Sequence, residues 1–437
     1  MRFTTSEVAE ATRGEVFGRE TGIDRVAIDS RLVEPGDLFV PIVAERDGHT
    51  FIAAAVSAGA AAYLTAGPIE AGTAVRVGDT SAALTDLGVH ARRRLAGEVV
   101  GITGSVGKTS LKDLIASVAS TTWSTHSSQG SFNNELGVPL TLANAPEDTT
   151  VTVVEMGARG VGHIAALCAV ARPTVGIVTV VAGAHLEQFG SLATVAIAKG
   201  ELVESLPANG LAVLNADDDL VSAMATRSQA QVVTFGRTRG EVRATHVELG
   251  ADLRARFELH SPWGTVSVLL GVAGEHQVTN ALGAAAAALA LGATTEAVAH
   301  GLGRATLSTG RMHLLTLANG TRVIDDSYNA NPTSMAAALR SLAALDAHAR
   351  VAVLGTMAEL GDGAEADHAG IAALAGELGL QVIAVGEPRY GRGVIHVDTP
   401  TDAVSALDDL ARSSSTAVLV KASRSAGLER VVKLMTG

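Results

Sequence analysis

The sequence feature that most constrains this chain is a glycine-rich segment, Gly104-Ser105-Val106-Gly107-Lys108-Thr109-Ser110, between a buried-strand pattern at 99–103 and a helix pattern at 108–119. Glycines let backbone N–H groups wrap an anion, and the start of a helix adds a favourable dipole. We expect Lys108 to neutralise β- and γ-phosphate oxygens and the Thr109 hydroxyl to ligate Mg²⁺. The segment therefore predicts an ATP-binding loop whose seven residues all contribute to the nucleotide site.

The loop departs from the usual P-loop pattern, which places a glycine five residues before the Gly-Lys pair. That position is Ile102, so the segment is the shorter Thr-Gly-x-x-Gly-Lys-Thr variant. The alternative interpretation is a glycine-rich strand-to-helix turn with an exposed lysine. The Lys-Thr-Ser ending and the flanking strand and helix favour ATP binding, although the loop alone does not separate a kinase from an ATPase or a ligase.

The composition narrows the class of protein without naming a function. With 437 residues, 47% hydrophobic and 18% charged, the chain has enough apolar material for several globular domains and is unlike a disordered or collagen-like protein. Only 3% of the residues are aromatic and the net charge is −12, which argues against a binding surface for nucleic acid. The single cysteine, Cys168, excludes an internal disulfide and is expected to be a buried thiol.

No pattern in the sequence indicates export or membrane insertion. The first residues, 1–7, turn polar almost at once, unlike a secretory signal. The most apolar tract, 281–293, is rich in alanine and shorter than the ~20 residues of a membrane span, so it predicts a buried helix. We therefore expect a cytoplasmic protein, with a monomer as the default expectation.

Strand and helix patterns alternate along the chain, which predicts an α/β protein with parallel sheets covered on both faces. A period-two pattern at 243–270 predicts an antiparallel appendage. Three units are expected, over 1–97, 98–309 and 310–437. Strands are expected at 25–29, 37–42, 99–103, 151–155, 175–181, 211–215, 322–326, 350–354, 381–385 and 417–420, and helices at 51–58, at 108–119 and after Asn331-Pro332.

The segment from Thr103 to Thr109 resembles the phosphate loop of the Mur ligases, the family that builds the peptide stem of bacterial peptidoglycan. Further blocks similar to that family follow in the same order and cover nearly the whole chain. They are 133–139, 155–160, 184–187 with 190–191, 198–201, 280–282, 310–312, 325–332, 360–361 with His368, and 421–425. The resemblance implies a three-domain architecture: a central P-loop parallel-sheet domain between an N-terminal α/β substrate domain and a C-terminal Rossmann-like domain.

Within the family, the blocks at 133–139, 155–159 and 326–332 resemble the ligase that joins D-alanyl-D-alanine to UDP-N-acetylmuramoyl-tripeptide with ATP. The resemblance implies that the substrate carboxylate is phosphorylated and that an amine attacks the acyl phosphate. The products are then UDP-N-acetylmuramoyl-pentapeptide, ADP and phosphate. The alternatives are a sister Mur-type or folylpolyglutamate-type ligase that adds one amino acid, and a nucleotide-binding regulatory protein without turnover.

The resemblance also implies four catalytic residues, Lys108, Glu155, His185 and Lys199. Thr109 is then a ligand of one Mg²⁺, while Glu155, His185 and Lys199 match the family's ligands of a second. Lys199 matches the lysine that becomes carbamylated, a change that turns an ammonium into an anionic oxygen ligand. A hard cation prefers oxygen, so Glu155 is the more typical ligand and His185 the less typical one.

Residues that match the family's substrate contacts lie in all three units. Asn280 matches a contact to adenine, and Arg311 and Asp326 match contacts to phosphates and ribose. The contacts expected for the nucleotide-peptide substrate are Asn133, Asn134 and Arg159, with Ser30 and Arg31 for its UDP portion. The positions that depart from residues common in the family are Thr356, Gln277 and the short loop 43–47.

Overall fold

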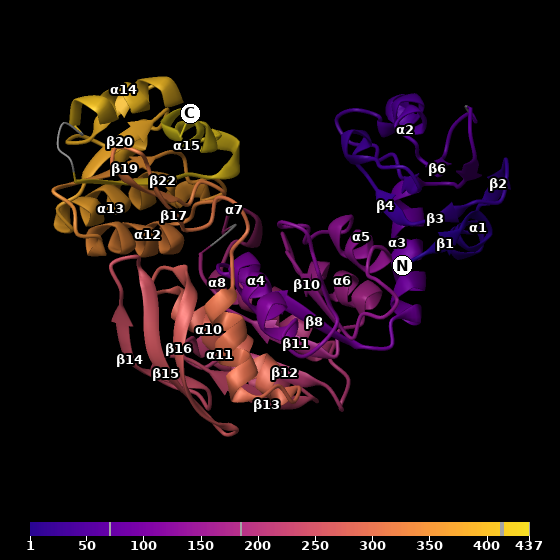
Figure 1. The fold of residues 1–437 in the computed structure, drawn as a ribbon, viewed down its shortest axis with the longest axis horizontal. Helices are drawn as coiled ribbons and strands as arrows, with labels where there is room; N and C mark the ends of the chain where they lie inside the picture. Colours follow the sequence, from indigo (N-terminus) through magenta and orange to yellow (C-terminus); the bar gives the residue numbers. More distant parts are fainter. Residues whose placement is uncertain (70, 184–185, 411–414, 437) are drawn as a thin grey trace.

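The computed structural model describes residues 1–69, 71–183, 186–410 and 415–436. Figure 1 shows three α/β parts arranged as a U, in which an N-terminal arm and a C-terminal arm rise from a central part. Each arm has its own sheet, and the central part has a second, smaller sheet at its edge. The α/β class predicted from the alternating patterns is confirmed.

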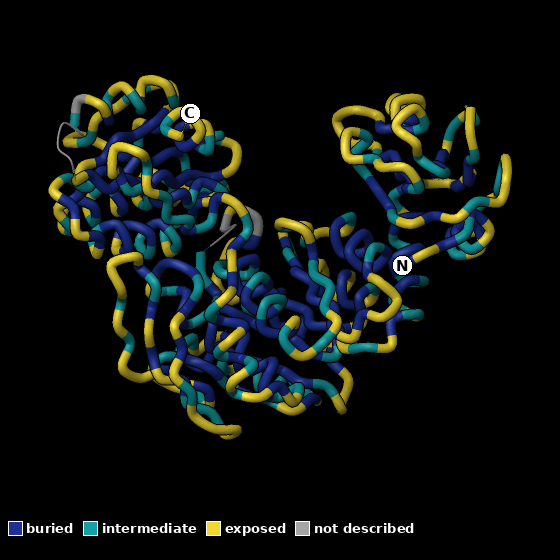
Figure 2. The backbone as a smooth tube through the Cα atoms, in the orientation of Figure 1, coloured by how far each residue is buried: buried dark blue, intermediate teal, exposed yellow. Residues whose placement is uncertain are grey.

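The central part is built on a parallel sheet of β8 (Glu98–Thr103), β9 (Thr125–Ser127), β10 (Val151–Glu155), β11 (Val175–Val178), β12 (Leu211–Asn215) and β13 (Gln231–Phe235). The strand order is β13-β12-β11-β8-β10-β9, and every neighbouring pair is parallel. β10, β11 and β12 are buried at every residue and β8 at every residue but its first, as parallel strands covered on both faces are (Figure 2). The carboxyl ends of β8, β10 and β11 therefore meet at one edge, where open α/β sheets bind ligands.

Helices cover both faces of the central sheet. One face carries α4 (Lys108–Ala119), α10 (Gln277–Ala290) and α11 (Thr295–Arg304), and the other carries α5 (Gly137–Ala143), α6 (His163–Ala171) and α8 (Leu192–Glu204). The short helices of this part are α7 (Leu186–Phe189), α9 (Asp219–Ser222) and the 3₁₀ turn η3 (Ala223–Arg227). α10 contains most of the alanine-rich tract and is buried along most of its length, as predicted.

An antiparallel sheet of β14 (Arg243–Leu249), β15 (Arg254–Ser261) and β16 (Gly264–Ala273) lies beside α11. The period-two pattern predicted it correctly. Its buried residues, among them Ala255, Phe257 and Leu259, join the core formed by α4 and α10. The sheet therefore extends the central part rather than forming a unit of its own.

The N-terminal arm is a mixed sheet in the order β2-β7-β6-β5-β4, with a two-stranded ribbon of β1 and β3 beside it. Its elements are β1 (Phe3–Thr4), α1 (Thr5–Thr12), β2 (Glu15–Phe17), β3 (Gly22–Ile23), β4 (Arg25–Ala27), η1 (Ser30–Leu32), β5 (Asp37–Phe39), η2 (Gly48–Phe51), α2 (Ile52–Ser57), β6 (Ala62–Thr65), β7 (Ala74–Arg76) and α3 (Thr80–Arg94). The helix expected at 51–58 is α2, which follows directly on the 3₁₀ turn η2.

One hydrophobic core runs from the N-terminal arm into the central part. α3 packs so closely on α5 that a Cβ on Gly88 would lie 2.4 Å from the Cβ of Pro139. The amide of Asn144, just after α5, accepts a hydrogen bond from the Val26 N–H at 2.8 Å and donates one to the Val26 carbonyl at 2.9 Å. Because Val26 lies in the edge strand β4, the Asn144 amide pairs with backbone groups of that edge in the way that a further strand would.

The C-terminal arm has a sheet in the order β17-β18-β22-β19-β20-β21, parallel except for the antiparallel pair β17–β18. Its elements are β17 (His313–Thr316), β18 (Arg322–Asp325), α12 (Pro332–Ala344), β19 (Ala349–Leu354), η4 (Gly361–Gly363), α13 (Ala364–Glu377), β20 (Gln381–Val385), η5 (Pro388–Tyr390), β21 (Ile395–Val397), α14 (Pro400–Leu410), β22 (Thr416–Lys421), η6 (Arg424–Ala426) and α15 (Glu429–Thr436). Asn331 caps α12 through the Ser334 N–H, and Pro332 opens the first turn, as predicted.

The structure also bears on the predictions about Cys168 and about membrane-spanning helices. Cys168 lies in α6 and is buried, and this burial raises the pKa of its thiol to about 12, so it is an inert structural thiol. Across the described ranges, no helix combines the length and the apolar character needed to cross a bilayer.

Candidate functional site

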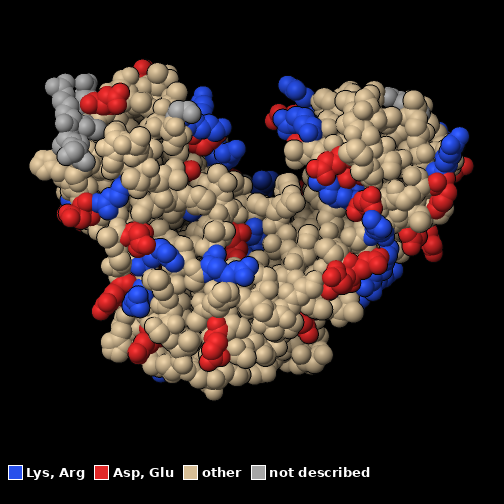
Figure 3. Space-filling view, in the orientation of Figure 1, with Lys and Arg blue, Asp and Glu red and all other residues tan. Residues whose placement is uncertain are grey.

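A cleft of about 810 Å³ lies at the carboxyl edge of the central sheet, and all three parts of the molecule line it. Ile28 reaches it from the N-terminal arm, the phosphate loop and the segment after β9 form its floor, and Arg311 and Asn331 belong to the C-terminal arm. In Figure 3 the surface is hollowed between the two arms, and Lys and Arg side chains stand at its borders on both sides. A ligand that filled this cleft would therefore meet residues from all three parts.

The end of β11 holds the phosphate loop in place. The Ser105 N–H donates to the Val180 carbonyl at 2.8 Å, and the Ser105 hydroxyl donates to the Ala182 carbonyl at 2.9 Å. Gly104 has a φ of 143°, and a Cβ there would lie 1.9 Å from Thr179 Oγ1, so only glycine fits this position. The glycine that the motif requires is thus explained by the close approach of the neighbouring strand.

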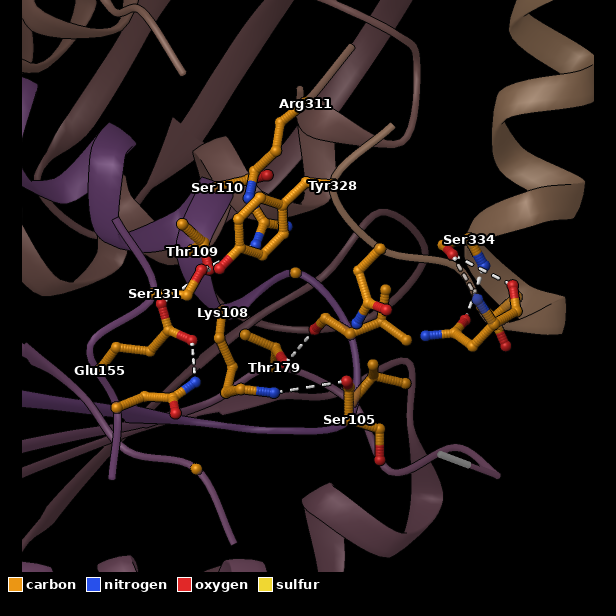
Figure 4. A pocket seen from close by; sticks show the side chains of 18 of the residues that line it. Ser105, Lys108, Thr109, Ser110, Ser131, Glu155, Thr179, Arg311, Tyr328 and Ser334 are labelled. Carbon is orange, nitrogen blue, oxygen red and sulfur yellow. Dashed lines mark hydrogen bonds between the residues drawn. The ribbon is translucent and has the colours of Figure 1, made fainter. Parts of the chain in front are cut away.

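The Lys108 side chain folds back over its own loop. Its Nζ donates to the Gly104 carbonyl at 2.7 Å and lies 3.4 Å from the Ser105 carbonyl (Figure 4). Burial lowers the pKa of Lys108, and Glu155 opposes that shift. Among the described residues, no carboxylate lies within salt-bridge distance of this ammonium. The position suits a cation that exchanges carbonyl contacts for an incoming phosphate.

A carboxylate and a hydroxyl meet beside the loop. Glu155, at the end of β10, is 1% exposed, and its two oxygens accept from Thr109 Oγ1 at 2.7 Å and from Asn133 Nδ2 at 2.8 Å. Ser131 Oγ lies 3.2 Å from Thr109 Oγ1, which adds a third oxygen to the group (Figure 4). Oxygen donors of this kind fit Mg²⁺. No cluster of three His, Cys, Asp or Glu side chains that could hold a metal exists within the described part of the chain.

Arg311 joins the C-terminal arm to this group. Its Nη2 donates to Ser131 Oγ at 3.0 Å, and its guanidinium stacks on the Tyr328 ring at 4.5 Å from the centroid (Figure 4). Its Nε is buried and has no hydrogen-bond partner among the residues that the structure describes. Asp326 lies behind it, where it accepts from the Met312 N–H at 3.1 Å and pairs with the ammonium of Lys421. A buried donor without a partner indicates that Arg311 is arranged for an anionic ligand.

Lys199 lies in α8 and is 3% exposed. Burial, with Lys108 nearby as the next cause, lowers the pKa of Lys199 to about 7. Its Nζ lies 5.8 Å from the centre of the Phe189 ring. This shift favours the uncharged amine, which is the form that reacts with electrophiles.

Two domain models match this chain: the Mur ligase middle domain over residues 102–288, and the Mur ligase, glutamate ligase domain over residues 310–424. The UDP-N-acetylmuramoyl-tripeptide--D-alanyl-D-alanine ligase of Escherichia coli strain K12 is 36% identical over 99% of this chain and 98% of its own length. The chain belongs to the Mur ligase family. The crystal structure of MurF from Acinetobacter baumannii matches with a TM-score of 0.90 at 32% identity, over 100% of this chain and 99% of the other.

MurF from Thermotoga maritima, solved in complex with ADP, matches with a TM-score of 0.81 at 27% identity, over 94% of this chain and 97% of the other. These similarities confirm both the resemblance and the Mur ligase architecture expected from the sequence. The match extends through the N-terminal arm, which neither domain model covers.

This Mur ligase brings most of the predicted site residues together in the cleft. Those that line it are Ser105, Val106, Gly107, Lys108, Thr109, Ser110, Asn133, Asn134, Glu155, Arg159, Lys199, Asn280, Arg311 and Asp326, while Gly104 lies at the base of the loop. Asn280 faces the loop directly, since a Cβ on Gly107 would lie 2.8 Å from its Oδ1. The predicted ligand His185 lies outside the described residues.

Ser30 and Arg31 are not brought into the cleft. They form the turn η1 of the N-terminal arm, where the Arg31 guanidinium is exposed and pairs with Asp29 at 2.6 Å. Ile28, two residues earlier, does line the cleft. The turn is therefore close to the cleft along the chain, but Ser30 and Arg31 do not line it.

Several polar residues of the Mur ligase cleft were not predicted as site residues, and Ser131, Thr179 and Gln277 are among them. Ser131 bridges Arg311 and Thr109, Thr179 holds the phosphate loop through a 2.6 Å bond to the Val106 carbonyl, and Gln277 accepts from Asn280 Nδ2 at 2.8 Å. Ser131 precedes the predicted site residues Asn133 and Asn134 by only two and three positions, so its place in the sequence could have indicated that it belongs to the site. Thr179 carried no such signal, because its role depends on which strand lies beside β8.

Proposed function

We propose that this chain is the ATP-dependent ligase that joins D-alanyl-D-alanine to UDP-N-acetylmuramoyl-tripeptide, giving UDP-N-acetylmuramoyl-pentapeptide, ADP and phosphate in peptidoglycan precursor synthesis. The observation that supports it most is the convergence of Lys108, Glu155 and Arg311 on one cleft in a chain similar throughout to enzymes of that name. The sister-ligase alternative is disfavoured because the relatives named for this activity cover nearly all of the chain.

The chemistry requires cations around the γ-phosphate. A carboxylate is a poor electrophile, and its phosphorylation supplies a leaving group while negative charge spreads over the transferred oxygens. Lys108 lies on the phosphate loop and Arg311 comes from the opposite arm, so the two cations approach from different domains. Closure of the C-terminal arm would bring both cations to the γ-phosphate. It would also exclude the water that hydrolyses an acyl phosphate.

Mg²⁺ fits the oxygen atoms beside the loop. Thr109 would hold one ion, which supplies positive charge to the nucleotide phosphates when bound, and its hydroxyl lies 2.7 Å from Glu155. We propose a second ion with Glu155, His185 and Lys199 as its ligands. Lys199 can serve as an oxygen ligand only as a carbamate, and its lowered pKa favours the neutral amine that reacts with CO₂.

The remaining residues divide by substrate. We propose that Asn280 contacts the adenine and that Asp326 contacts the ribose. Asn133, Asn134 and Arg159 face the same cleft and suit the nucleotide-peptide substrate, while Ser30 and Arg31 would meet its UDP portion at the N-terminal arm. The domains would be 1–97 for UDP-substrate binding, 98–309 for ATP and 310–437 for closure. We propose a monomer as the working form.

Phosphate release from ATP tests the proposed function. We expect release only when UDP-N-acetylmuramoyl-tripeptide and D-alanyl-D-alanine are both present, and no release from the Lys108→Ala variant under the same conditions. Equal release with a single D-amino acid in place of the dipeptide would move the assignment to a sister ligase. Full activity in Lys108→Ala would overturn the phosphate-loop assignment.

A further inference from the structure

A buried ion pair on α4 has no part in the chemistry proposed above. Lys112 and Asp113 lie one helical turn after Lys108 and Thr109; Lys112 is 2% exposed, and the Asp113 side chain is 13% exposed. Lys112 Nζ lies 2.9 Å from Asp113 Oδ1. A buried charge is costly unless all of its hydrogen-bonding capacity is used, so the partners of this pair indicate its role.

Lys112 holds the segment that carries the predicted substrate contacts. Its Nζ donates to the Ser128 carbonyl at 2.8 Å and to the Gly130 carbonyl at 3.0 Å. With Asp113, these two carbonyls use all three donors of the ammonium. Residues 128–134, here called the substrate loop, contain Ser131, Asn133 and Asn134. Lys112, on α4, therefore fixes the backbone of this loop.

Asp113 holds the connection to the C-terminal arm. Its Oδ2 accepts from the Ser308 N–H at 2.7 Å, and its Oδ1 lies 3.2 Å from the Ser308 hydroxyl. Ser308 is followed by Gly310 and Arg311, where the chain enters the arm. On the other side, the Gly310 carbonyl accepts from the Tyr328 N–H at 3.0 Å. The connection is therefore fixed to α4 at one end and to the arm at the other.

The two attachments meet again in the cleft. Arg311 Nη2 donates to Ser131 Oγ, so the connection fixed by Asp113 touches the loop fixed by Lys112. Ser131 in turn lies 3.2 Å from Thr109, at the start of the same helix. The contacts form a closed ring through α4, the substrate loop and the C-terminal arm.

We propose that Lys112 and Asp113 are positioning residues that set the substrate loop and the C-terminal arm relative to the phosphate loop. The inference rests on the proposed function, because it assigns the substrate loop to the nucleotide-peptide substrate. Neither side chain touches the reacting groups. Their effect reaches the reaction through Ser131, Asn133 and Arg311.

The test is the Lys112→Met variant, which keeps the length of the side chain and removes its charge and donors. We expect its KM for UDP-N-acetylmuramoyl-tripeptide to rise about tenfold or more, because two buried carbonyls lose their partner and the loop shifts. KM for ATP should stay within about twofold, since the bonds of the Lys112 ammonium go to Ser128, Gly130 and Asp113 and not to the groups proposed to bind phosphate. Lys433→Met, the same change on an exposed lysine of α15, is the matched control and should leave both constants unchanged.

A second variant and a readout independent of turnover cover the case in which Lys112→Met does not fold. Asp113→Asn keeps the shape of the side chain and removes its charge. It should lower kcat, because the connection that positions Arg311 is held less firmly, and should have a smaller effect on KM for the nucleotide-peptide. Amide hydrogen exchange should increase at 129–134 in Lys112→Met and at 306–310 in Asp113→Asn. Unchanged KM values and unchanged exchange at these segments would overturn the inference. If the wild-type enzyme turns over as proposed, that result leaves the proposed function intact.

Discussion

At the scale of single residues, the site is organised by two lysines in contrasting surroundings. Lys108 is held by backbone carbonyls of its own loop, whereas Lys199 is enclosed in α8 beside Phe189. Burial lowers the pKa of both, and for Lys199 to about 7. The first is suited to bind an anion as a cation, and the second is suited to react as an amine.

The Lys199→Ala variant tests the carbamate. We expect activity to fall by about 100-fold, because a ligand of the proposed second Mg²⁺ is lost. Formate or acetate should restore part of the activity, since a small carboxylate can occupy the space left by the carbamate. The measurement is phosphate release at increasing concentrations of each acid. Rescue by methylammonium instead of formate would contradict the carbamate and indicate an ammonium role.

Two departures from the family pattern have structural explanations. Thr356, where the family often has Asp, hydrogen bonds to the buried carboxylate of Glu387, and an Asp there would place a like charge beside it. Gln277 orients Asn280 through a 2.8 Å bond and is 2% exposed. Neither explanation was accessible from the sequence, because each depends on a partner fixed by the fold.

At the scale of elements, a buried cluster of His368 and Glu387, with Arg389 beside it, supports the loop 355–360. Residues 358–360 of this loop line the cleft. His368 Nε2 accepts from the Met357 N–H at 2.9 Å and also lies 3.4 Å from Glu387. Burial alone would raise the pKa of Glu387, but hydrogen bonds from the Arg389 side chain and backbone lower it to about 2. The loop that reaches the cleft from the C-terminal arm is therefore held by an ionised carboxylate.

The Glu387→Gln variant should make folding of the C-terminal arm depend less on pH. The folded pKa lies below the unfolded value of about 4.3, so ionised Glu387 stabilises the fold above pH ~4.3 and loses this effect as the pH falls toward 2. We expect a loss on the order of 3 kcal/mol at pH 7. Denaturant unfolding at pH 7, 4 and 3 should show that the difference in the free energy of unfolding between wild type and variant becomes smaller as the pH falls. Glu377→Gln, at an exposed position of α13, is the control; a gap that stays constant with pH would contradict the account.

The sequence predicted elements better than contacts between them. The strand patterns located β8, β10, β12 and β18 within about a residue, because buried parallel strands are short apolar runs between turns. β11 ends at Val178 rather than at residue 181, since the following residues bind the phosphate loop. The bonds that join domains could not be predicted: Asp113 and Ser308 are 195 residues apart, and nothing local marks the pair.

At the scale of the whole molecule, the net charge of −12 has to be reconciled with anionic substrates. Cations line the cleft where the substrates would lie, with Lys108 and Arg159 on the central part and Arg311 on the C-terminal arm. Both arms share apolar cores with the central part: the N-terminal arm through α3 and α5, and the C-terminal arm through Leu253 and Ala273 of the antiparallel sheet. Arg311 adds a polar contact from the C-terminal arm to Ser131 in the cleft.

The central claim is ligation through a phosphorylated carboxylate, and oxygen transfer tests it most directly. UDP-N-acetylmuramoyl-tripeptide is labelled with ¹⁸O in its terminal carboxylate and incubated with ATP and D-alanyl-D-alanine, and the products are weighed by mass spectrometry. The account predicts pentapeptide product with one ¹⁸O in the new amide and phosphate that carries the other. Pentapeptide with unlabelled phosphate, or phosphate release without pentapeptide, would contradict it.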